Sequence, residues 1–258
     1  MFPICWKIPV TGMKIKIKTA AASVVGPLHA NKNLPCQDFY KICSRGKNFV
    51  AVVSDGAGSA KYGKTGARIV CETLVDMLKN AAWTDVRTAV ASAIASARKK
   101  LTFHRLNKSK SEAGLNDFAA TVVGMVYRGR QGCFFHIGDG AALAYHDEDI
   151  ASFVASPPEN GSFSCETFFY TQECWAKNLR FTPLEKINTV FLMTDGVTNF
   201  SFSEDYRKIE KGFILPIDNF LKGEKSKQKA ERALANTLNT QQARKLNSDD
   251  KTLLWVKL

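Results

Sequence analysis

Short stretches of alternating apolar and polar or small residues recur along the chain, and a period of two is typical of strands. The first covers residues 14–25 and is rich in Ile, Val and Thr. Short polar turns separate several of the others, which predicts antiparallel sheets and not strands joined by helical crossovers. Further strands are expected at residues 39–43, 49–53, 118–127, 132–137, 141–145, 150–154, 189–193 and 252–258.

Three longer stretches carry apolar residues at helical spacing. The first is residues 62–78, and the second is residues 85–103 with Thr84 as its expected N-cap. The third covers residues 212–239 and is expected to break near Gly223. Antiparallel strands together with these helices indicate an α+β fold.

Aspartates recur where the apolar runs end. Asp55, Asp139 and Asp195 each follow such a run and precede a Gly, while Asp38 and Asp249 stand just before one. A single Asp-Gly pair is an ordinary turn, so the argument rests on the recurrence. Because Asp is a poor strand former and a hard oxygen ligand, we expect these carboxylates to converge at one pole of a sheet. Divalent cations would offset their repulsion, so the pattern predicts an enzyme that uses Mg²⁺ or Mn²⁺.

Composition limits the class of protein. The chain has 258 residues, of which 45% are hydrophobic; this suffices for one domain with a core, and no internal repeat is visible. No apolar stretch is long enough for a membrane span, and the N-terminus lacks a signal-peptide pattern, so no membrane partner is expected. The seven Cys include no CxxC pair, which favours reduced, mostly buried thiols and a cytoplasmic protein over a zinc site or a catalytic Cys.

The net charge of +12 allows an acidic partner. A basic stretch at the end of the second predicted helix admits two interpretations, a solvated helix terminus or a nucleic-acid contact. Since neither interleaved aromatic residues nor a known motif accompanies it, no nucleic-acid partner is expected. The stretch comprises Arg98, Lys99, Lys100, Arg105, Lys108 and Lys110.

The order of the acidic motifs resembles that of the metal-dependent protein phosphatase family, the type 2C serine/threonine phosphatases, in its bacterial branch. The resemblance covers about residues 14–258 and leaves residues 1–13 as an expected N-terminal extension of a single catalytic domain. The matching motifs are Gln37-Asp38, Ser54-Asp55-Gly56-Ala57-Gly58, Asp117-Phe118-Ala119-Ala120-Thr121, Gly138-Asp139-Gly140, Thr194-Asp195-Gly196 and Ser248-Asp249-Asp250-Lys251-Thr252.

The resemblance implies a four-layer α-β-β-α sandwich with two central antiparallel sheets and a flap at about residues 156–181. It implies that Asp55 bridges two metal ions, with the Gly56 carbonyl on one ion and Asp195 and Asp249 on the other. Asp38 would support the site directly or through water. The position of Asp139 corresponds to a third, weaker ion in bacterial members.

The same resemblance implies a reaction and its partners. Water bridging two Mg²⁺ or Mn²⁺ ions would attack the phosphorus of phosphoserine or phosphothreonine in a protein, with no covalent enzyme intermediate. The partners would be a phosphorylated protein and an opposing serine/threonine kinase, and a monomer is expected.

The chain departs from the family pattern near the substrate. Gln37 stands where many relatives carry Glu, and no Arg precedes Asp38 to clamp a phosphate, which leaves His29 and Lys32 as the available donors. Ala57 replaces a His that animal members use as an acid. Asp250 replaces a common Asn, and is expected to raise metal affinity or to face solvent.

Two other interpretations stay open. The altered clamp region is compatible with a catalytically weak or inactive phosphoprotein-binding module with the same fold, and the net charge of +12 is compatible with a basic nucleic-acid-binding protein. Turnover of para-nitrophenyl phosphate that Mn²⁺ stimulates and EDTA abolishes would exclude the first. Nucleic-acid retention that depends on salt and survives chelation would indicate the second.

Overall fold

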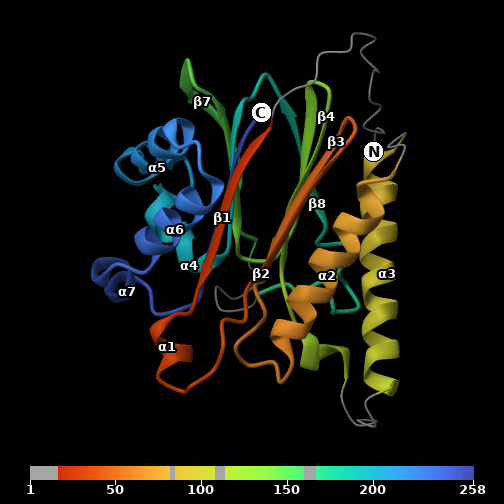
Figure 1. The fold of residues 1–258 in the computed structure, drawn as a ribbon. Coiled ribbons are helices and arrows are strands. Elements are labelled where there is room, and N and C mark those ends of the chain that lie inside the picture. The colour runs from red at the N-terminus through yellow and green to blue at the C-terminus, as the bar shows by residue number, and fades with distance from the viewer. Residues whose placement is uncertain (1–16, 82–84, 108–113, 160–166) are drawn as a thin grey trace.

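Two five-stranded antiparallel sheets form the centre of the molecule (Figure 1). The computed structural model describes residues 17–81, 85–107, 114–159 and 167–258. One sheet has the strand order β1-β12-β9-β6-β7, and the other has the order β2-β3-β4-β5-β8. The first sheet comprises β1 (Lys18–Val24), β6 (Ala141–His146), β7 (Asp149–Ser156), β9 (Thr189–Met193) and β12 (Lys251–Lys257), and the second comprises β2 (Phe39–Arg45), β3 (Asn48–Ser54), β4 (Val122–Arg128), β5 (Gln131–Ile137) and β8 (Arg180–Glu185).

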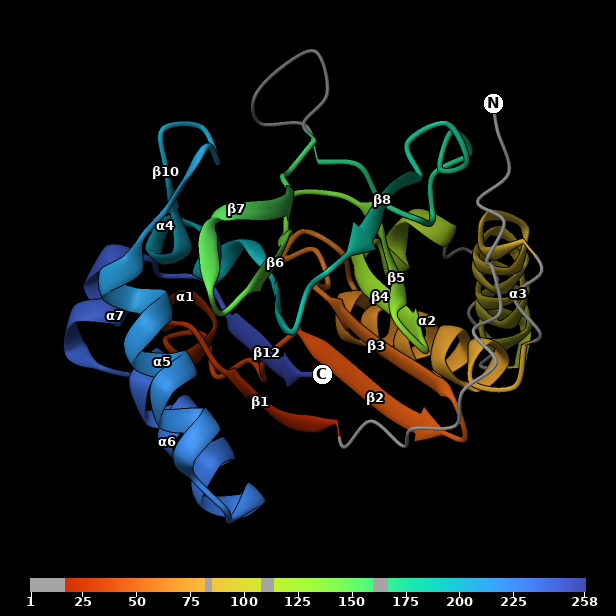
Figure 2. The same ribbon diagram turned by 90° about the horizontal axis from the view of Figure 1, so that it is seen from above.

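Helices cover the outer face of each sheet, as the view along the strands shows (Figure 2). The second sheet packs against α2 (Gly63–Leu78) and α3 (Val86–Asn107). The first packs against α4 (Asp195–Ser201), α5 (Lys211–Gly223) and α6 (Lys227–Leu238). The expected α+β class and the four-layer sandwich are therefore confirmed. The shorter elements are α1 (Pro27–Ala30), the 3₁₀ helix η1 (Leu115–Phe118), α7 (Gln241–Leu246) and the hairpin of β10 (Phe202–Ser203) and β11 (Lys208–Ile209).

The core forms three apolar layers because the central strands are buried on both faces. Along β3, Val50 and Val52 face the helices, while Phe49, Ala51 and Val53 face the other sheet. Alternate side chains of a strand point to opposite faces, so a strand between two covered faces is apolar throughout. This explains why the runs before the aspartates are almost uninterrupted.

Strand β8 is the main element that the sequence pattern does not predict. It pairs with β5 at the end of the expected excursion over residues 156–181. Its sequence RFTPLE contains a Pro and polar residues that conceal the alternation, and an edge strand tolerates Pro because one side needs no hydrogen bonds. The pattern also misses α4 and α7, which are too short for helical periodicity to stand out.

The start of α3 differs slightly from the expected one. Thr84 lies outside the described residues, as does the expected N-terminal extension at residues 1–13. Among the residues described, the carboxylate of Asp85 accepts hydrogen bonds from the Arg87 backbone N–H and the Thr88 hydroxyl.

Within the described part of the chain, no helix is long and apolar enough to span a membrane.

The described end of the flap is anchored to the second sheet and its helices. The Tyr170 side chain is fully buried, and its hydroxyl donates to the Gly66 carbonyl at 2.9 Å. The Arg98 guanidinium donates to the carbonyls of Tyr170 at 3.0 Å and Gln172 at 2.8 Å. Arg98 is therefore not simply a solvated charge at a helix end, because it holds this segment in place.

Candidate metal centre

Strand ends from both sheets meet at one pole, the lower one in Figure 1. In the second sheet, Asp55 directly follows β3 and Asp38 directly precedes β2. In the first sheet, Asp195 lies two residues after the end of β9, and Asp249 lies two residues before β12. Antiparallel pairing brings the end of one strand beside the start of the next, so these four positions share a pole.

The carboxylates form a compact cluster around Asp55. Oxygens of Asp55, Asp139 and Asp195 lie within 4.8 Å of one another. Asp38 and Asp195 are each within hydrogen-bonding reach of Asp55. The Thr194 hydroxyl donates to Asp38 Oδ2 at 2.8 Å, which joins the two sheets at this point.

Burial and mutual repulsion raise the pKa values of these groups. Burial is the largest cause in each case; it raises the pKa of Asp38 to about 7 and that of Asp195 to about 8. The pKa of Asp55 is raised well above its ordinary value by burial and then by the charges of Asp38 and Asp195. Burial also raises the pKa of Asp139. Without cations, the cluster therefore favours retained protons.

The donor set fits Mg²⁺ or Mn²⁺. Oδ1 of Asp38, of Asp139 and of Asp195 is buried and lacks a hydrogen-bond partner among the described residues. Unpartnered buried carboxylate oxygens are costly, and hard divalent cations prefer such ligands. No described Lys or Arg forms a salt bridge with these three aspartates. A cation can therefore supply the missing charge.

Backbone contacts fix the turn that carries Asp55. The Thr121 hydroxyl accepts a hydrogen bond from the Asp55 N–H at 3.0 Å, and the Thr121 N–H donates to the Asp55 carbonyl at 2.8 Å. Gly56 is buried and forms an isolated bridge with Ala120. Thr121 therefore positions the Asp55 turn as a neighbour and not as part of the carboxylate cluster.

Asp249 lies at the edge of the cluster in a tightly bonded turn. Its Oδ1 accepts the Asp250 N–H at 2.7 Å, and its N–H donates to Asn247 Oδ1 at 2.8 Å. The Lys251 ammonium donates to the Asn247 carbonyl at 2.7 Å and the Asp249 carbonyl at 2.8 Å. Both residues support the Asp249 turn. Lys251 belongs to the last of the matching motifs, whereas Asn247 was not singled out in the sequence, where its only signal was the run of turn-forming residues before the last strand.

The two expected phosphate donors differ in position. His29 is 8% exposed, and its Nδ1 lies 2.8 Å from Asp250 Oδ2. Lys32 is exposed. The side chain of Gln37 turns to accept the Lys64 N–H at 2.9 Å. Asp250 is 1% exposed, so the expectation that it could face solvent is wrong. Its carboxylate is buried because it accepts hydrogen bonds from the backbone N–H groups of Gly26 and Gln37.

Asp139 contacts the flap. The Thr167 hydroxyl donates to Asp139 Oδ2 at 2.6 Å, so one end of the flap is tied to the carboxylate cluster.

His136, on the strand before Asp139, is fully buried, and burial lowers its pKa well below the ordinary value. Its Nδ1 lies 3.1 Å from an Arg180 guanidinium nitrogen, and this guanidinium requires an acceptor. His136 is therefore neutral and supports the segment before Asp139.

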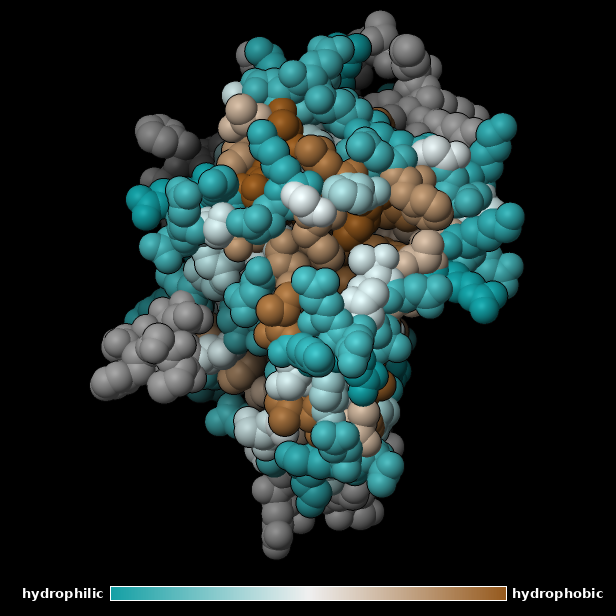
Figure 3. All heavy atoms as spheres, turned by 90° about the vertical axis from the view of Figure 1, so that its left-hand side faces the viewer, coloured by the Kyte–Doolittle hydropathy of each residue, from teal (hydrophilic) through white to brown (hydrophobic). Residues whose placement is uncertain are grey.

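Hydrophobic side chains are also exposed on the helical side of the first sheet. Figure 3 shows the side of the molecule that carries α5 to α7, where hydrophobic side chains are exposed among hydrophilic ones. Phe220 on α5 is 49% exposed and Leu246 on α7 is 62% exposed.

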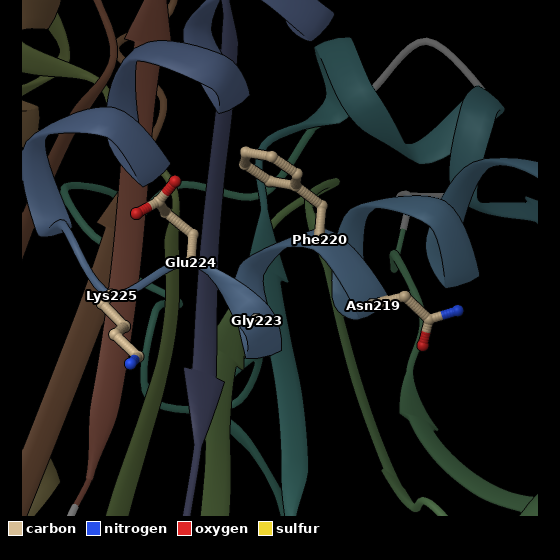
Figure 4. A pocket seen from close by; sticks show the side chains of 5 residues that line it. All are labelled: Asn219, Phe220, Gly223, Glu224 and Lys225. Carbon is tan, nitrogen blue, oxygen red and sulfur yellow. The ribbon is translucent and has the colours of Figure 1, made fainter.

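A hollow of about 500 Å³ lies at the end of α5 (Figure 4). The Lys18 ammonium donates to the neighbouring Lys222 carbonyl, which places this hollow at the start of β1, at the pole opposite the carboxylates. It is lined by Asn219, Phe220, Gly223, Glu224 and Lys225, and none of the clustered aspartates reaches it.

A carboxylate cluster at one pole of two antiparallel sheets offers the oxygen ligands that divalent metal ions prefer. The chain belongs to the protein phosphatase 2C family, whose model matches residues 25–242. The resemblance found in the motifs is thereby confirmed, and the chain is by class a phosphoprotein phosphatase.

Individual relatives agree with this assignment. The chain is 26% identical over 253 residues to serine/threonine-protein phosphatase 3 of Escherichia coli (strain K12), covering 92% of this chain and 97% of that protein. The fold is similar to that of the serine/threonine phosphatase Stp1 from Staphylococcus aureus, with a TM-score of 0.65 at 13% identity over 98% of this chain and 99% of that one. It is also similar to RsbX in complex with magnesium, with a TM-score of 0.57 at 14% identity over 94% and 95% of the two chains.

Proposed function

We propose that the chain is a metal-dependent serine/threonine protein phosphatase that hydrolyses phosphoserine and phosphothreonine by attack of a water held between two Mg²⁺ or Mn²⁺ ions. One observation carries the proposal: buried carboxylate oxygens of Asp38, Asp139 and Asp195 lie around Asp55 and have no hydrogen-bond partner among the described residues. When bound, such ions supply a nucleophile at neutral pH and positive charge for the phosphoryl oxygens.

The proposed ligands follow from their places in the cluster. Asp55 lies at its centre and would bridge two ions, assisted by the Gly56 carbonyl. Asp195 and Asp249 would complete the coordination of the second ion. Asp38, held by Thr194, would support the site, and Asp139 would serve a third ion.

Residues outside the cluster would handle the substrate. His29 is the better placed of the two candidate phosphate donors, because it is held beside Asp249 and Asp250, whereas Lys32 is exposed. Ala57 leaves no side-chain acid directly after Gly56. The substrate would be a phosphoprotein modified by an opposing serine/threonine kinase, and we expect a cytoplasmic monomer. The similarity to bacterial serine/threonine phosphatases supports this substrate class.

The test is hydrolysis of para-nitrophenyl phosphate and of a phosphothreonine peptide with Mn²⁺ and then with EDTA. We expect activity that Mn²⁺ stimulates, that EDTA removes, and that Asp55→Ala or Asp195→Ala abolishes while the protein stays folded. Asp76→Ala is the matched control, because Asp76 is a surface carboxylate paired with Lys79 on α2. Full activity in either site variant would contradict the mechanism, and peptide binding without turnover would indicate a non-catalytic module.

A further inference from the structure

The buried carboxylate of Asp250 gathers the loop that precedes Asp38. Its Oδ1 accepts the Gly26 N–H at 2.7 Å. Its Oδ2 accepts the Gln37 N–H at 2.6 Å and lies 2.8 Å from His29 Nδ1. All three donors belong to residues 26–37, so a single side chain closes both ends of this loop and holds the ring between them.

Only an acceptor on both oxygens can satisfy this arrangement. Asn has one acceptor oxygen and a donating amide group, so either orientation of its side chain would place a donor against an N–H. The loop also approaches the Asp250 turn closely, since a Cβ on Gly26 would lie 2.2 Å from the Asp249 carbonyl carbon. The Asp at position 250 is therefore matched to this loop and to His29.

The bond to Asp250 fixes which edge of the His29 ring is free. Because the buried carboxylate accepts, Nδ1 carries a proton, and Nε2 is left on the opposite edge. Nε2 has no hydrogen-bond partner among the described residues. A Cβ on Gly58 would lie 3.5 Å from Nε2, so the absence of a side chain there leaves Nε2 open toward the turn that follows Asp55 and Gly56.

The ring lies between the turn that carries Asp249 and Asp250 and the turn that follows Asp55. Ligand atoms of His29, Asp249 and Asp250 lie within 4.8 Å of one another, and Nδ1 is the ring nitrogen that bonds to Asp250. Nε2 faces Gly58, three residues after Asp55, so a phosphoryl group held beside Asp55 would approach the ring from the Nε2 side.

We propose that Asp250 is a positioning residue that aims His29 Nε2 at the phosphoryl oxygens of the substrate. The pair takes the place of a guanidinium clamp, which residues 1–38 do not contain. This inference rests on the proposed function for its substrate, but the binding of a phosphate group can be measured without turnover. Lys32 has no part in it.

The experiment measures the dissociation constant of inorganic phosphate for the Mn²⁺-loaded protein by calorimetry. We expect Asp250→Asn and His29→Ala each to weaken phosphate binding about tenfold, as expected for one hydrogen bond to a charged group. The double variant is expected to be no weaker than either single variant, since coupled residues are not additive. Mn²⁺ affinity should change less than about twofold, and KM for para-nitrophenyl phosphate should rise more than kcat falls.

His29→Asn is the matched variant, because its side-chain amide can still donate to Asp250 while Nε2 is lost. We expect it to weaken phosphate binding as much as His29→Ala does, with an unchanged melting temperature. If Asp250→Asn unfolds the protein, Asp250→Glu, which keeps both acceptors, replaces it in the cycle. A smaller loss of phosphate affinity than in His29→Ala is then expected.

Two results would overturn the proposal. One is wild-type phosphate affinity in the His29 variants, and the other is an undiminished effect of Asp250→Asn in the His29→Ala background. Either result together with normal Mn²⁺-dependent hydrolysis would remove this inference and leave the proposed function. If the wild-type protein shows no turnover but the variants lose phosphate binding, the proposed function is contradicted and this inference is kept.

Discussion

Two groups of buried carboxylates lie at opposite poles of the same sandwich and differ in their surroundings. Asp218 on α5 is 1% exposed and accepts hydrogen bonds from Tyr145 at 2.7 Å and Trp255 at 2.9 Å. The Lys222 ammonium lies 2.6 Å from it. At the other pole, oxygens of the Asp55 cluster have no hydrogen-bond partner among the described residues. The Asp218 carboxylate is thus satisfied by neighbouring side chains, whereas the described part of the chain leaves oxygens of the cluster unpaired.

The pKa shifts of the two regions run in opposite directions. Burial alone would raise the pKa of Asp147, but hydrogen bonds from Lys222, Lys257 and Thr189 lower it to about 2. Burial and neighbouring carboxylates raise that of Asp195 to about 8. The Asp147 side chain is 32% exposed and pairs with the ammonium groups of Lys222 and Lys257, whereas Asp195 lies among other carboxylates. Exposure and cationic partners together therefore distinguish the two carboxylates.

The largest expected effect comes from the centre of the unpaired cluster. Asp55→Asn should reduce Mn²⁺-dependent hydrolysis about a thousandfold, because the proposed ions lose their shared ligand. In EDTA the same variant should be at least as stable as the wild type, since a repulsive charge is removed. Steady-state kinetics and urea unfolding measure the two effects. A marked loss of stability in EDTA would mean that Asp55 holds the fold and not the ions.

The reciprocal change is made in the satisfied region. Asp218→Ala should lower the free energy of unfolding by about 3 kcal/mol, because Tyr145 and Trp255 lose a buried acceptor and Lys222 loses a counter-charge. Activity per folded molecule should stay within about twofold of the wild type. Urea unfolding and kcat are the measurements, and a large fall in kcat would break the contrast between the two regions.

The two regions should also respond differently to pH. In EDTA, Asp38 and Asp195 bind protons more tightly in the folded chain than in the unfolded chain, where their pKa is about 4. Their contribution to stability is therefore present at low pH and is lost as pH rises toward about 7 for Asp38 and about 8 for Asp195. Asp147 contributes above pH 4 and loses its contribution as pH falls toward about 2.

Thermal unfolding from pH 4 to pH 9 measures this difference. Saturating Mn²⁺ should remove the loss of stability at high pH, because cations replace the protons at the cluster. The Asp218 region should show no response to Mn²⁺. An identical pH profile with and without Mn²⁺ would contradict the assignment of the cluster as the metal site.

The smallest expected effect lies at the contact between the flap and the cluster. Thr167→Val removes the donor to Asp139 Oδ2 and should lower the free energy of unfolding by about 1 kcal/mol. Hydrolysis at saturating Mn²⁺ should change less than about threefold, because Asp139 is assigned to a third ion. A loss as large as that of Asp55→Asn would show that the flap contact organises the whole centre.

The sequence predicted the sheets well because their strands are buried on both faces and joined by short turns. It missed β8, where a Pro and polar residues at the sheet edge conceal the alternation. Convergence of the aspartates could be inferred since antiparallel strands share a pole. The hydrogen bonds of Asp250 could not be inferred in this way, because its partners Gly26 and His29 lie more than 200 positions away in the chain.

Supporting residues were the hardest to foresee for the same reason. Thr194 reaches Asp38 across the two sheets, and Thr121 bonds the Asp55 backbone from another strand. Thr and Asn are common in turns, so their composition carries no signal of such contacts. Local pattern therefore located the ligands, whereas the tertiary fold determined what holds them.

The central claim is that the Asp55 cluster holds divalent cations and that the Asp218 carboxylate does not. Anomalous diffraction from crystals soaked in Mn²⁺ tests it most directly. We predict two strong peaks between Asp55, Asp195 and Asp249, a third and weaker peak beside Asp139, and none beside Asp218. The absence of an anomalous peak beside Asp55 under saturating Mn²⁺ would contradict the account.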